Sequence, residues 1–160
     1  MTEPSARNII FICMGNICRS PMAEGIFLHK IREHGIRDEF TVDSAGTGGW
    51  HSGDAPDHRS SRTARARGIM LLSRARKVTP RDFDAFDLLI CMDDENAMNL
   101  ERMGCPPEKI RRLMEYHPES EYREVPDPYY GGEDGFELMY ELIDQAIDRL
   151  LERLRPSSNK

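Results

Sequence analysis

The sequence predicts a single α/β domain in which four parallel strands form one sheet and helices cover both of its faces. Three observations support this prediction. The chain has 160 residues, which is the usual length of one domain. Short, nearly continuous apolar runs, typical of strands buried on both faces, alternate with segments of helical periodicity. No linker, repeat or low-complexity segment interrupts this alternation, so we expect one domain over residues 1–160, with polar ends at 1–7 and 156–160.

The first predicted unit is a strand, a loop and a helix. Asn8–Cys13 is an apolar run with the pattern of a fully buried strand. The loop Met14–Arg19 that follows it contains glycine and asparagine. Ser20 is a good N-cap and Pro21 is tolerated at the first helical position, so we expect a helix from there to about Gly35.

The rest of the chain repeats this alternation. Three more strands are expected, at Phe40–Ser44, Asp87–Met92 and Ile110–Met114. Four more helices are expected, at Asp57–Arg67, after the cap Thr79-Pro80-Arg81-Asp82, after the third strand as far as Arg102, and at Gly135–Arg155. The longest loops are expected at Ala45–Asp54 and Tyr116–Glu133. Strands that alternate with helices indicate βαβ units and therefore a parallel sheet.

Composition and charge exclude several classes of protein. A net charge of −6 argues against non-specific nucleic-acid binding, for which a basic domain is expected. No apolar run approaches the ~20 residues of a membrane span, and the first run, Ile9–Cys13, is too short for a signal peptide. We therefore expect a cytoplasmic protein that binds neither nucleic acid nor membrane and whose four cysteines are thiols. His51, His58 and His117 lack the spacing of metal ligands and are expected at the surface.

Cys13–Ser20 carries the most specific pattern in the chain, a cysteine followed by five residues, an arginine and a serine. A loop between the carboxyl end of a parallel strand and the N-terminus of a helix turns backbone N–H groups inward and forms an anion-binding cradle. Arg19 adds a planar guanidinium that matches two phosphate oxygens. The same positive field favours the thiolate of Cys13, which is a nucleophile. This combination predicts phosphoryl transfer in a phosphate-binding loop after the first strand.

The loop does not have the features of a nucleotide-binding loop. It lacks the required Gly-Lys-Ser/Thr, and no cluster of aspartates stands beside it in the sequence. We therefore expect no magnesium, no other metal and no cofactor. Arg19 and the loop amides are expected to stabilise the negative charge of the transition state instead.

Cys13–Glu24 (CMGNICRSPMAE), together with Asp127-Pro128-Tyr129-Tyr130 far downstream, resembles the low-molecular-weight protein tyrosine phosphatases. The resemblance covers nearly the whole chain, because further segments match the family at Asp43–Thr47, Trp50, Pro56-Asp57, Gly68-Ile69, Asp82-Phe83, Phe86-Asp87 and Cys91–Asp93. It implies hydrolysis of phosphotyrosine in proteins through a cysteinyl-phosphate intermediate. Tyrosine-phosphorylated proteins are then the expected partners.

The resemblance also implies roles for individual residues. Cys13 is expected to be the nucleophile, Arg19 the phosphate-binding arginine and Asp127 the general acid and base. Since a tyrosyl leaving group has a pKa of ~10, its protonation as the bond breaks matters, and Pro128 keeps Asp127 extended. The phosphate is expected to lie against Met14, Gly15, Asn16, Ile17, Cys18, Arg19 and Ser20.

A polar network behind the loop is a further implication of the resemblance. Asn16 and Ser44 are expected to hold the loop in shape, and the Ser20 hydroxyl is expected to steady the thiolate. Many family members have a histidine in this network at the position of Ser73. This departure puts the wiring of the network in question but not the chemistry.

The substrate pocket is expected to combine Ile17 with the aromatic side chains of Trp50, Tyr129 and Tyr130. These rings would form a slot for the planar phosphotyrosine side chain, and ordinary loop packing is the alternative. The family's arginine phosphatases resemble this loop, but they have threonine at the position of Ile17. Its apolar contact therefore favours an aromatic ring over phosphoarginine.

Cys18 and the basic stretch 58–81 each allow two interpretations. Cys18 is either a small loop side chain or a resolving thiol that traps oxidised Cys13 as a disulfide. Cys91 is expected in the core and Cys105 in a loop, where it would be inert. Residues 58–81 hold seven arginines, one lysine and no acid, so this stretch is either a solvated basic face or a docking patch for an acidic partner.

Three rival functions remain open at this point. An arsenate reductase shares this loop and fold, but it needs two further thiols placed to relay a disulfide, and Cys91 is expected to be buried. A protein arginine phosphatase belongs to the same family. A module that binds phosphotyrosine without turnover would be favoured by loss of Cys13, Arg19 or Asp127, and all three are present.

Overall fold

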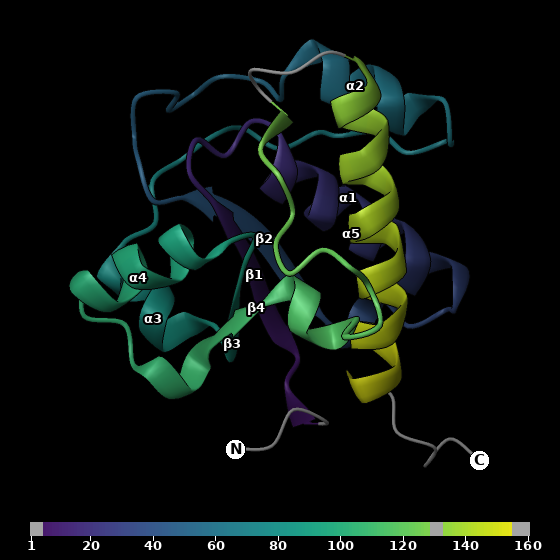
Figure 1. Cartoon of the computed structure of the whole chain (residues 1–160). Helices are drawn as coiled ribbons and strands as arrows, with labels where there is room; N and C mark the ends of the chain where they lie inside the picture. Colours follow the sequence, from purple (N-terminus) through teal and green to yellow (C-terminus); the bar gives the residue numbers. More distant parts are fainter. Residues whose placement is uncertain (1–4, 129–132, 155–160) are drawn as a thin grey trace.

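The sheet has four parallel strands in the order β2-β1-β3-β4 (Figure 1). The computed structural model describes residues 5–128 and 133–154. The strands are β1 (Asn8–Cys13), β2 (Thr41–Gly46), β3 (Leu88–Cys91) and β4 (Ile110–Arg112). Because all four run in the same direction, their carboxyl ends meet at one edge of the sheet, toward the top of Figure 1. The predicted sheet is confirmed, and open sheets of this kind bind ligands at that edge.

One face of the sheet packs against the two longest helices. α1 (Arg19–Glu33) lies directly on β1 and β2, and α5 (Glu133–Leu154) packs on α1. Ile9 and Phe11 of β1 belong to this core and are fully buried. α5 contributes apolar side chains at helical spacing, namely Phe136, Met139, Ile143, Ile147, Leu150 and Leu154. α2 (His58–Arg65) packs against both helices at their upper end in Figure 1.

The opposite face carries a smaller core. Along β1, Ile10 and Ile12 alternate with Ile9 and Phe11, and they are also fully buried. Burial on both faces explains why β1 is almost entirely apolar. They pack with residues of α3 (Pro80–Ala85) and α4 (Asp94–Arg102), two helices that lie on the left in Figure 1. Helices therefore cover both faces, as predicted.

Several element boundaries differ from the prediction. α1 begins at Arg19 with Cys18 at its N-cap position, so Ser20 is not the cap and its hydroxyl is used elsewhere. β2 runs on past Ser44 to Gly46 because Gly46 pairs in register with Cys13. A Cβ on Gly46 would lie 2.6 Å from the Met14 carbonyl oxygen, so this pairing requires glycine. Short 3-10 turns replace loop or strand at Arg37–Glu39, Pro107–Lys109 and Leu113–Tyr116.

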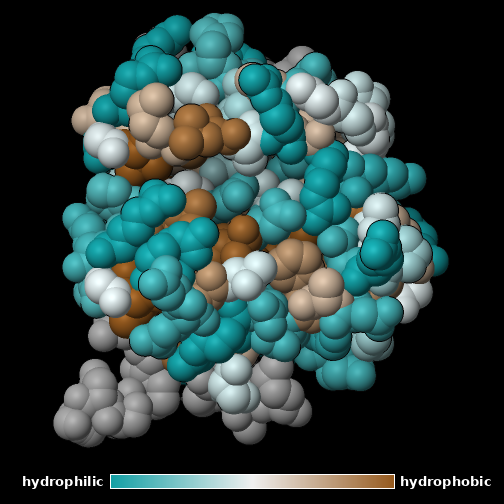
Figure 2. Space-filling model, turned by 180° about the vertical axis from the view of Figure 1, so that it is seen from behind, coloured by the Kyte–Doolittle hydropathy of each residue, from teal (hydrophilic) through white to brown (hydrophobic). Residues whose placement is uncertain are grey.

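The polar start of the chain is anchored where it meets β1. Ala6 is fully buried, and the backbone N–H groups of Arg7 and Asn8 each donate to Asp87 Oδ2 at 2.9 Å. The polar end at 156–160 lies outside the described residues. Within the described ranges, no helix is both long and apolar enough to cross a membrane. Figure 2 shows that apolar side chains reach the back face in patches framed by hydrophilic ones.

Candidate active site

The loop after β1 wraps around the sulfur of Cys13. Asn16 adopts a φ of 59°, in the left-handed region that asparagine tolerates better than most residues. This conformation turns the Asn16 backbone N–H toward Cys13, and the N–H donates to Sγ at 3.3 Å. Cys13 is 3% exposed and lies at the floor of the loop. The sequence placed the thiol there correctly.

A chain of hydrogen bonds supports this sulfur from behind. The Asn16 side-chain amide donates to Ser20 Oγ at 2.8 Å and to Ser44 Oγ at 3.1 Å. Ser20 Oγ lies 3.0 Å from Cys13 Sγ. Because the Ser20 oxygen already accepts a hydrogen bond from Asn16, its proton is available to donate to the sulfur. Asn16, Ser20 and Ser44 are thus in contact, as the predicted network requires.

Glu24 ends this chain, a contact that the sequence pattern did not reveal. Ser44 Oγ donates to Glu24 Oε1 at 2.6 Å. Burial raises the pKa of Glu24, against hydrogen bonds from Ser44 and Ser73 that lower it. Ser73, which stands where many family members have a histidine, therefore contacts the far end of the network. Glu24 lies within the segment that resembles the family, but its place in α1 does not indicate a contact with Ser44.

Arg19 is clamped by three oxygen atoms. Its Nη1 donates to Asp93 Oδ2 at 2.8 Å and to the Val125 carbonyl at 2.9 Å, and Nη2 lies 3.6 Å from Asp127 Oδ2. Burial opposes the charged guanidinium, but the negative charges of Cys13, Asp93 and Asp127 outweigh it and raise the pKa of Arg19. The structure therefore adds Asp93, which the sequence did not single out, as the residue that orients Arg19.

The loop opens into a cavity of about 270 Å³. Its lining brings together Cys13, Met14, Gly15, Ile17, Cys18, Arg19, Trp50, His51 and Asp127. The three expected catalytic residues thus meet in one cavity. Of the four expected pocket residues, Ile17 and Trp50 line it, whereas Tyr129 and Tyr130 lie outside the described residues. Asn16 and Ser20 stand behind the loop rather than in the cavity wall.

His51 was expected at the surface; its side chain is 25% exposed and also lines the cavity. Its Nδ1 lies 3.2 Å from Asp54 Oδ2, and its ring lies beside Gly15, where a Cβ would be 3.0 Å from Cδ2. Backbone hydrogen bonds explain why His51 lies beside the cavity. The N–H groups of Thr47 and Gly48 donate to the carbonyls of Cys13 and Met14 at 2.9 and 3.0 Å, which carries the segment after β2 over the loop.

The other cysteines are all buried thiols. Burial raises the pKa of Cys18 to about 12, and the negative charges of Asp57 and Cys13 act in the same direction. Cys91 and Cys105 lie in the smaller core, and burial raises the pKa of both, in Cys105 to about 11. The prediction for Cys91 is confirmed, and Cys105 lies in a loop as predicted, with its side chain buried in the smaller core.

The basic stretch 58–81 is divided by ion pairs. Arg59 pairs with Asp57 at 3.0 Å. Arg67 pairs with Glu137, and its guanidinium lies over the ring of Tyr140. Arg76 pairs with Asp82 and Asp43 at 2.9 and 3.0 Å. These three arginines form ion pairs within the fold. An acidic partner of this stretch stays a prediction, and it would have to bind the remaining cations.

Comparison with known proteins identifies the family. The family model for low molecular weight phosphotyrosine protein phosphatases matches residues 8–160. The enzyme of that description from Sus scrofa is 35% identical over 159 residues, which cover 97% of this chain and 100% of the relative. Fold, loop and cavity thus define a phosphatase. The chain belongs to the low molecular weight phosphotyrosine protein phosphatase family, and its enzyme class is protein-tyrosine phosphatase.

Solved structures agree with this assignment. A protein tyrosine phosphatase from Entamoeba histolytica, with Hepes in its active site, has a TM-score of 0.90 and 35% identity, covering 96% of this chain and 99% of its own. A Drosophila arginine phosphatase has a TM-score of 0.87 and 32% identity, covering 92% and 98%. The fold is therefore shared by proteins described as acting on two different phosphorylated side chains.

The buried Glu24 predicts a specific pH dependence of stability. Since its pKa is raised in the folded state, folding takes up a proton as pH rises past the ordinary value of 4.5, and stability is lost in that range. Glu24→Gln removes this loss while its amide oxygen still accepts from Ser44. Relative to wild type, the free energy of unfolding of E24Q should therefore increase from pH 4 to pH 7, as measured by urea denaturation.

Glu101→Gln on the exposed side of α4 is the matched control. Its difference from wild type should stay constant over the same pH range. An E24Q difference that is equally flat, or that shrinks as pH rises, would contradict the role assigned to Glu24.

Proposed function

We propose that this enzyme hydrolyses phosphotyrosine in proteins in two steps. The Cys13 thiolate attacks phosphorus in line, the phosphorus–oxygen bond to tyrosine breaks, and Asp127 gives its proton to the departing phenolate. The product of this step is a cysteinyl-phosphate. In the second step Asp127 takes a proton from water, the resulting hydroxide attacks phosphorus, and phosphate leaves with regeneration of the thiolate.

The observation that carries this proposal is the environment of the Cys13 sulfur. It accepts hydrogen bonds from the Ser20 hydroxyl and the Asn16 N–H, and it lines the same cavity as Arg19. These donors stabilise negative charge on the sulfur, and hydrogen bonds to charged groups are each worth about 1.5–3 kcal/mol. The loop amides and Arg19 would hold the phosphoryl oxygens, so the cradle itself supplies the electrostatic stabilisation.

The position of Asp127 supports its role as acid and base. Its side chain is 31% exposed at the cavity wall, and its carboxylate lies 3.6 Å from Arg19 Nη2. A phosphoryl group held by Arg19 would therefore lie close to Asp127. Pro128 restricts Asp127 to an extended backbone, which presents the carboxylate to the cavity.

Cys13→Ser should abolish turnover and preserve phosphate binding. Without the thiolate the first step has no nucleophile, and we expect activity on phosphotyrosine to fall by a factor of about 10³ or more. The amides and Arg19 still form the cradle, so inorganic phosphate should still bind, as titration calorimetry would measure. Cys105→Ser, the same exchange in the smaller core, is the control and should retain turnover. A C13S enzyme with a substantial fraction of wild-type activity would exclude Cys13 as the nucleophile.

Asp127→Ala should slow hydrolysis according to the leaving group. A phenol with a pKa near 10 needs protonation, so its loss should be about 10²- to 10⁴-fold, whereas nitrophenolates of low pKa should lose least. Rates for a series of aryl phosphates give the dependence directly. Equal losses across the series would assign Asp127 a structural role instead.

A protein arginine phosphatase is the second candidate, because the Drosophila arginine phosphatase is among the similar structures. Two features favour phosphotyrosine. Ile17 gives the cavity an apolar wall that suits an aromatic ring, and Trp50 adds a flat surface. Among the described lining residues Asp127 is the sole acid, so a guanidinium would lose hydration there with little compensation.

Ile17→Thr tests this choice. Under identical conditions, the wild-type kcat/KM should be higher on phosphotyrosine than on phosphoarginine. The substitution should shift the ratio of these two kcat/KM values toward phosphoarginine. Leu28→Thr on α1 replaces an aliphatic side chain outside this cavity and should leave the ratio unchanged. A wild-type preference for phosphoarginine, or an unchanged ratio in I17T, would show that Ile17 is not the discriminator.

The other rivals are less well supported. An arsenate reductase would relay a disulfide from Cys13 through two further thiols. Cys91 pairs in register with Ile12 and packs in the smaller core with Cys105, on the face of the sheet opposite Cys13. A binding module without turnover has no need for Asp127 beside the nucleophile.

Cys18 remains a candidate resolving thiol. It lines the same cavity as Cys13, so a disulfide between them after mild oxidation is the proposed protection against over-oxidation. Burial raises the pKa of Cys18 to about 12, so the thiol form is favoured at neutral pH.

A further inference from the structure

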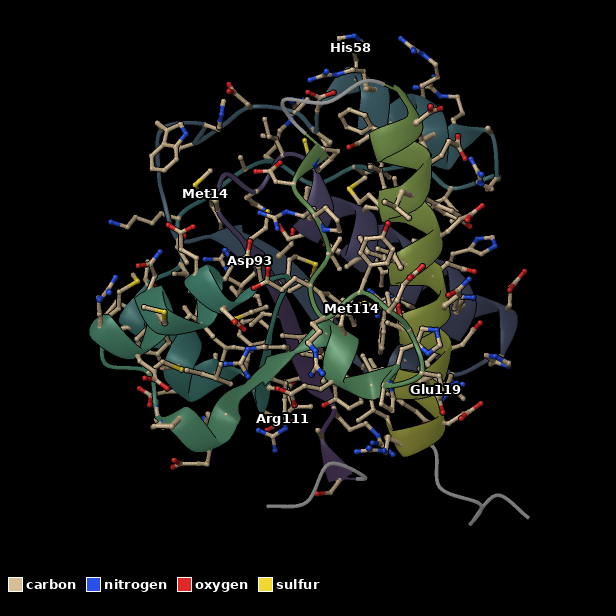
Figure 3. The ribbon with its side chains drawn as sticks, in the orientation of Figure 1. Met14, His58, Asp93, Arg111, Met114 and Glu119 are labelled. Atoms are coloured by element: carbon tan, nitrogen blue, oxygen red, sulfur yellow. The ribbon has the colours of Figure 1, made fainter. Side chains whose placement is uncertain are left out.

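A second hollow lies beside the active-site cavity and shares two walls with it. Met14 and Trp50 line both spaces, so these two side chains form the partition between them. The second space, here called the side hollow, has a volume of about 350 Å³ and is bounded on its far side by Lys77, Glu95, Asn99 and Arg102. In Figure 3, Met14 points from the loop after β1 toward the side of the molecule that carries α4. Neither the proposed chemistry nor the core uses this space.

The side hollow is built into the carboxyl edge of the sheet. The segment that carries Lys77 adds to the edge of β2, since Gly46 donates to the Arg76 carbonyl and Val78 donates to the Gly46 carbonyl, both at 2.8 Å. Gly46 itself pairs with Cys13. The side hollow and the nucleophile are therefore held in a fixed relation by backbone hydrogen bonds.

Its charged groups come from two elements. Glu95, Asn99 and Arg102 follow one another at spacings of four and three residues, which places them on one face of α4. Arg102 donates to Asn99 Oδ1 at 3.1 Å, a neutral partner that positions the guanidinium without cancelling its charge. Lys77 is exposed and forms no ion pair within residues 5–128 or 133–154. Two cations thus face one carboxylate, and the net charge favours an anion.

We propose that the side hollow is a substrate subsite for an acidic side chain within three residues of the phosphotyrosine. The inference rests on the proposed function and names the class of peptide that it favours. A peptide held by its phosphotyrosine ring in the active-site cavity extends about 3.3–3.6 Å per residue, so a near neighbour reaches past Trp50. Its carboxylate would there meet Lys77 and Arg102.

The experiment compares two phosphotyrosyl peptides that differ only in having glutamate or glutamine at the three positions on either side of the tyrosine. Wild type should hydrolyse the acidic peptide with a kcat/KM about 3- to 30-fold higher, as expected for one or two partly exposed ion pairs. The double variant Lys77→Gln, Arg102→Gln should lose most of this preference through KM, with kcat unchanged. Glu95→Gln should increase the preference, an opposite effect that a general loss of structure cannot produce.

Arg65→Gln is the matched control, because it removes one exposed charge of the same basic stretch outside the side hollow. It should leave the preference within about twofold of wild type. Para-nitrophenyl phosphate, which has no flanking residues, should be hydrolysed equally by all the variants.

The possible failures are distinct. If wild type does not hydrolyse para-nitrophenyl phosphate, the proposed function and the subsite both fall. If it does, but the two peptides are hydrolysed equally, the subsite alone is overturned. The subsite is also overturned if Arg65→Gln abolishes the preference as strongly as the double variant. The preference would then come from long-range steering by net charge.

Discussion

The hydrogen bond between the Ser20 hydroxyl and the Cys13 sulfur is the contact on which the rest of the site depends. It forms only because Ser20 lies in the first turn of α1 instead of capping it, and because Asn16 holds the serine oxygen at 2.8 Å. Asn16 in turn adopts a positive φ that directs its own N–H to the sulfur. A buried thiolate without these donors would be strongly disfavoured by desolvation. The conformation of the loop therefore determines which hydrogen bonds the Cys13 sulfur accepts.

The sheet holds this loop from behind, and it does so with residues that look unremarkable in the sequence. The Arg76 backbone N–H donates to Asn16 Oδ1 at 3.0 Å, while the Arg76 side chain pairs with Asp43 and Asp82. An arginine from a stretch with the composition of a basic surface thus fixes the amide that orients Ser20. This contact positions the Cys13 sulfur through Asn16 and Ser20, which explains why the loop needs the segment on the edge of β2 as well as β1.

The sequence predicts local patterns well and long-range contacts poorly. The apolar run of β1, the helical periodicity of α5 and the spacing from Cys13 to Arg19 each depend on neighbouring residues, and all three are found as predicted. The roles of Glu24, Asp93 and His51 depend on segments that meet only in the folded chain. Ser20 was misplaced as a helix cap because its hydroxyl has two possible partners, and tertiary structure selects the sulfur over the backbone. The pattern of apolar residues in the sequence does not reveal which partner the Ser20 hydroxyl takes.

The central claim is that Cys13 carries the phosphoryl group during turnover. Rapid acid quench of the enzyme mixed with a ³²P-labelled phosphotyrosyl peptide, followed by peptide mapping, tests it most directly. We predict label on the peptide that contains Cys13, formed in a burst no larger than the enzyme concentration. Phosphate release at the full rate with no labelled protein at any quench time, or with label on another residue, would contradict it.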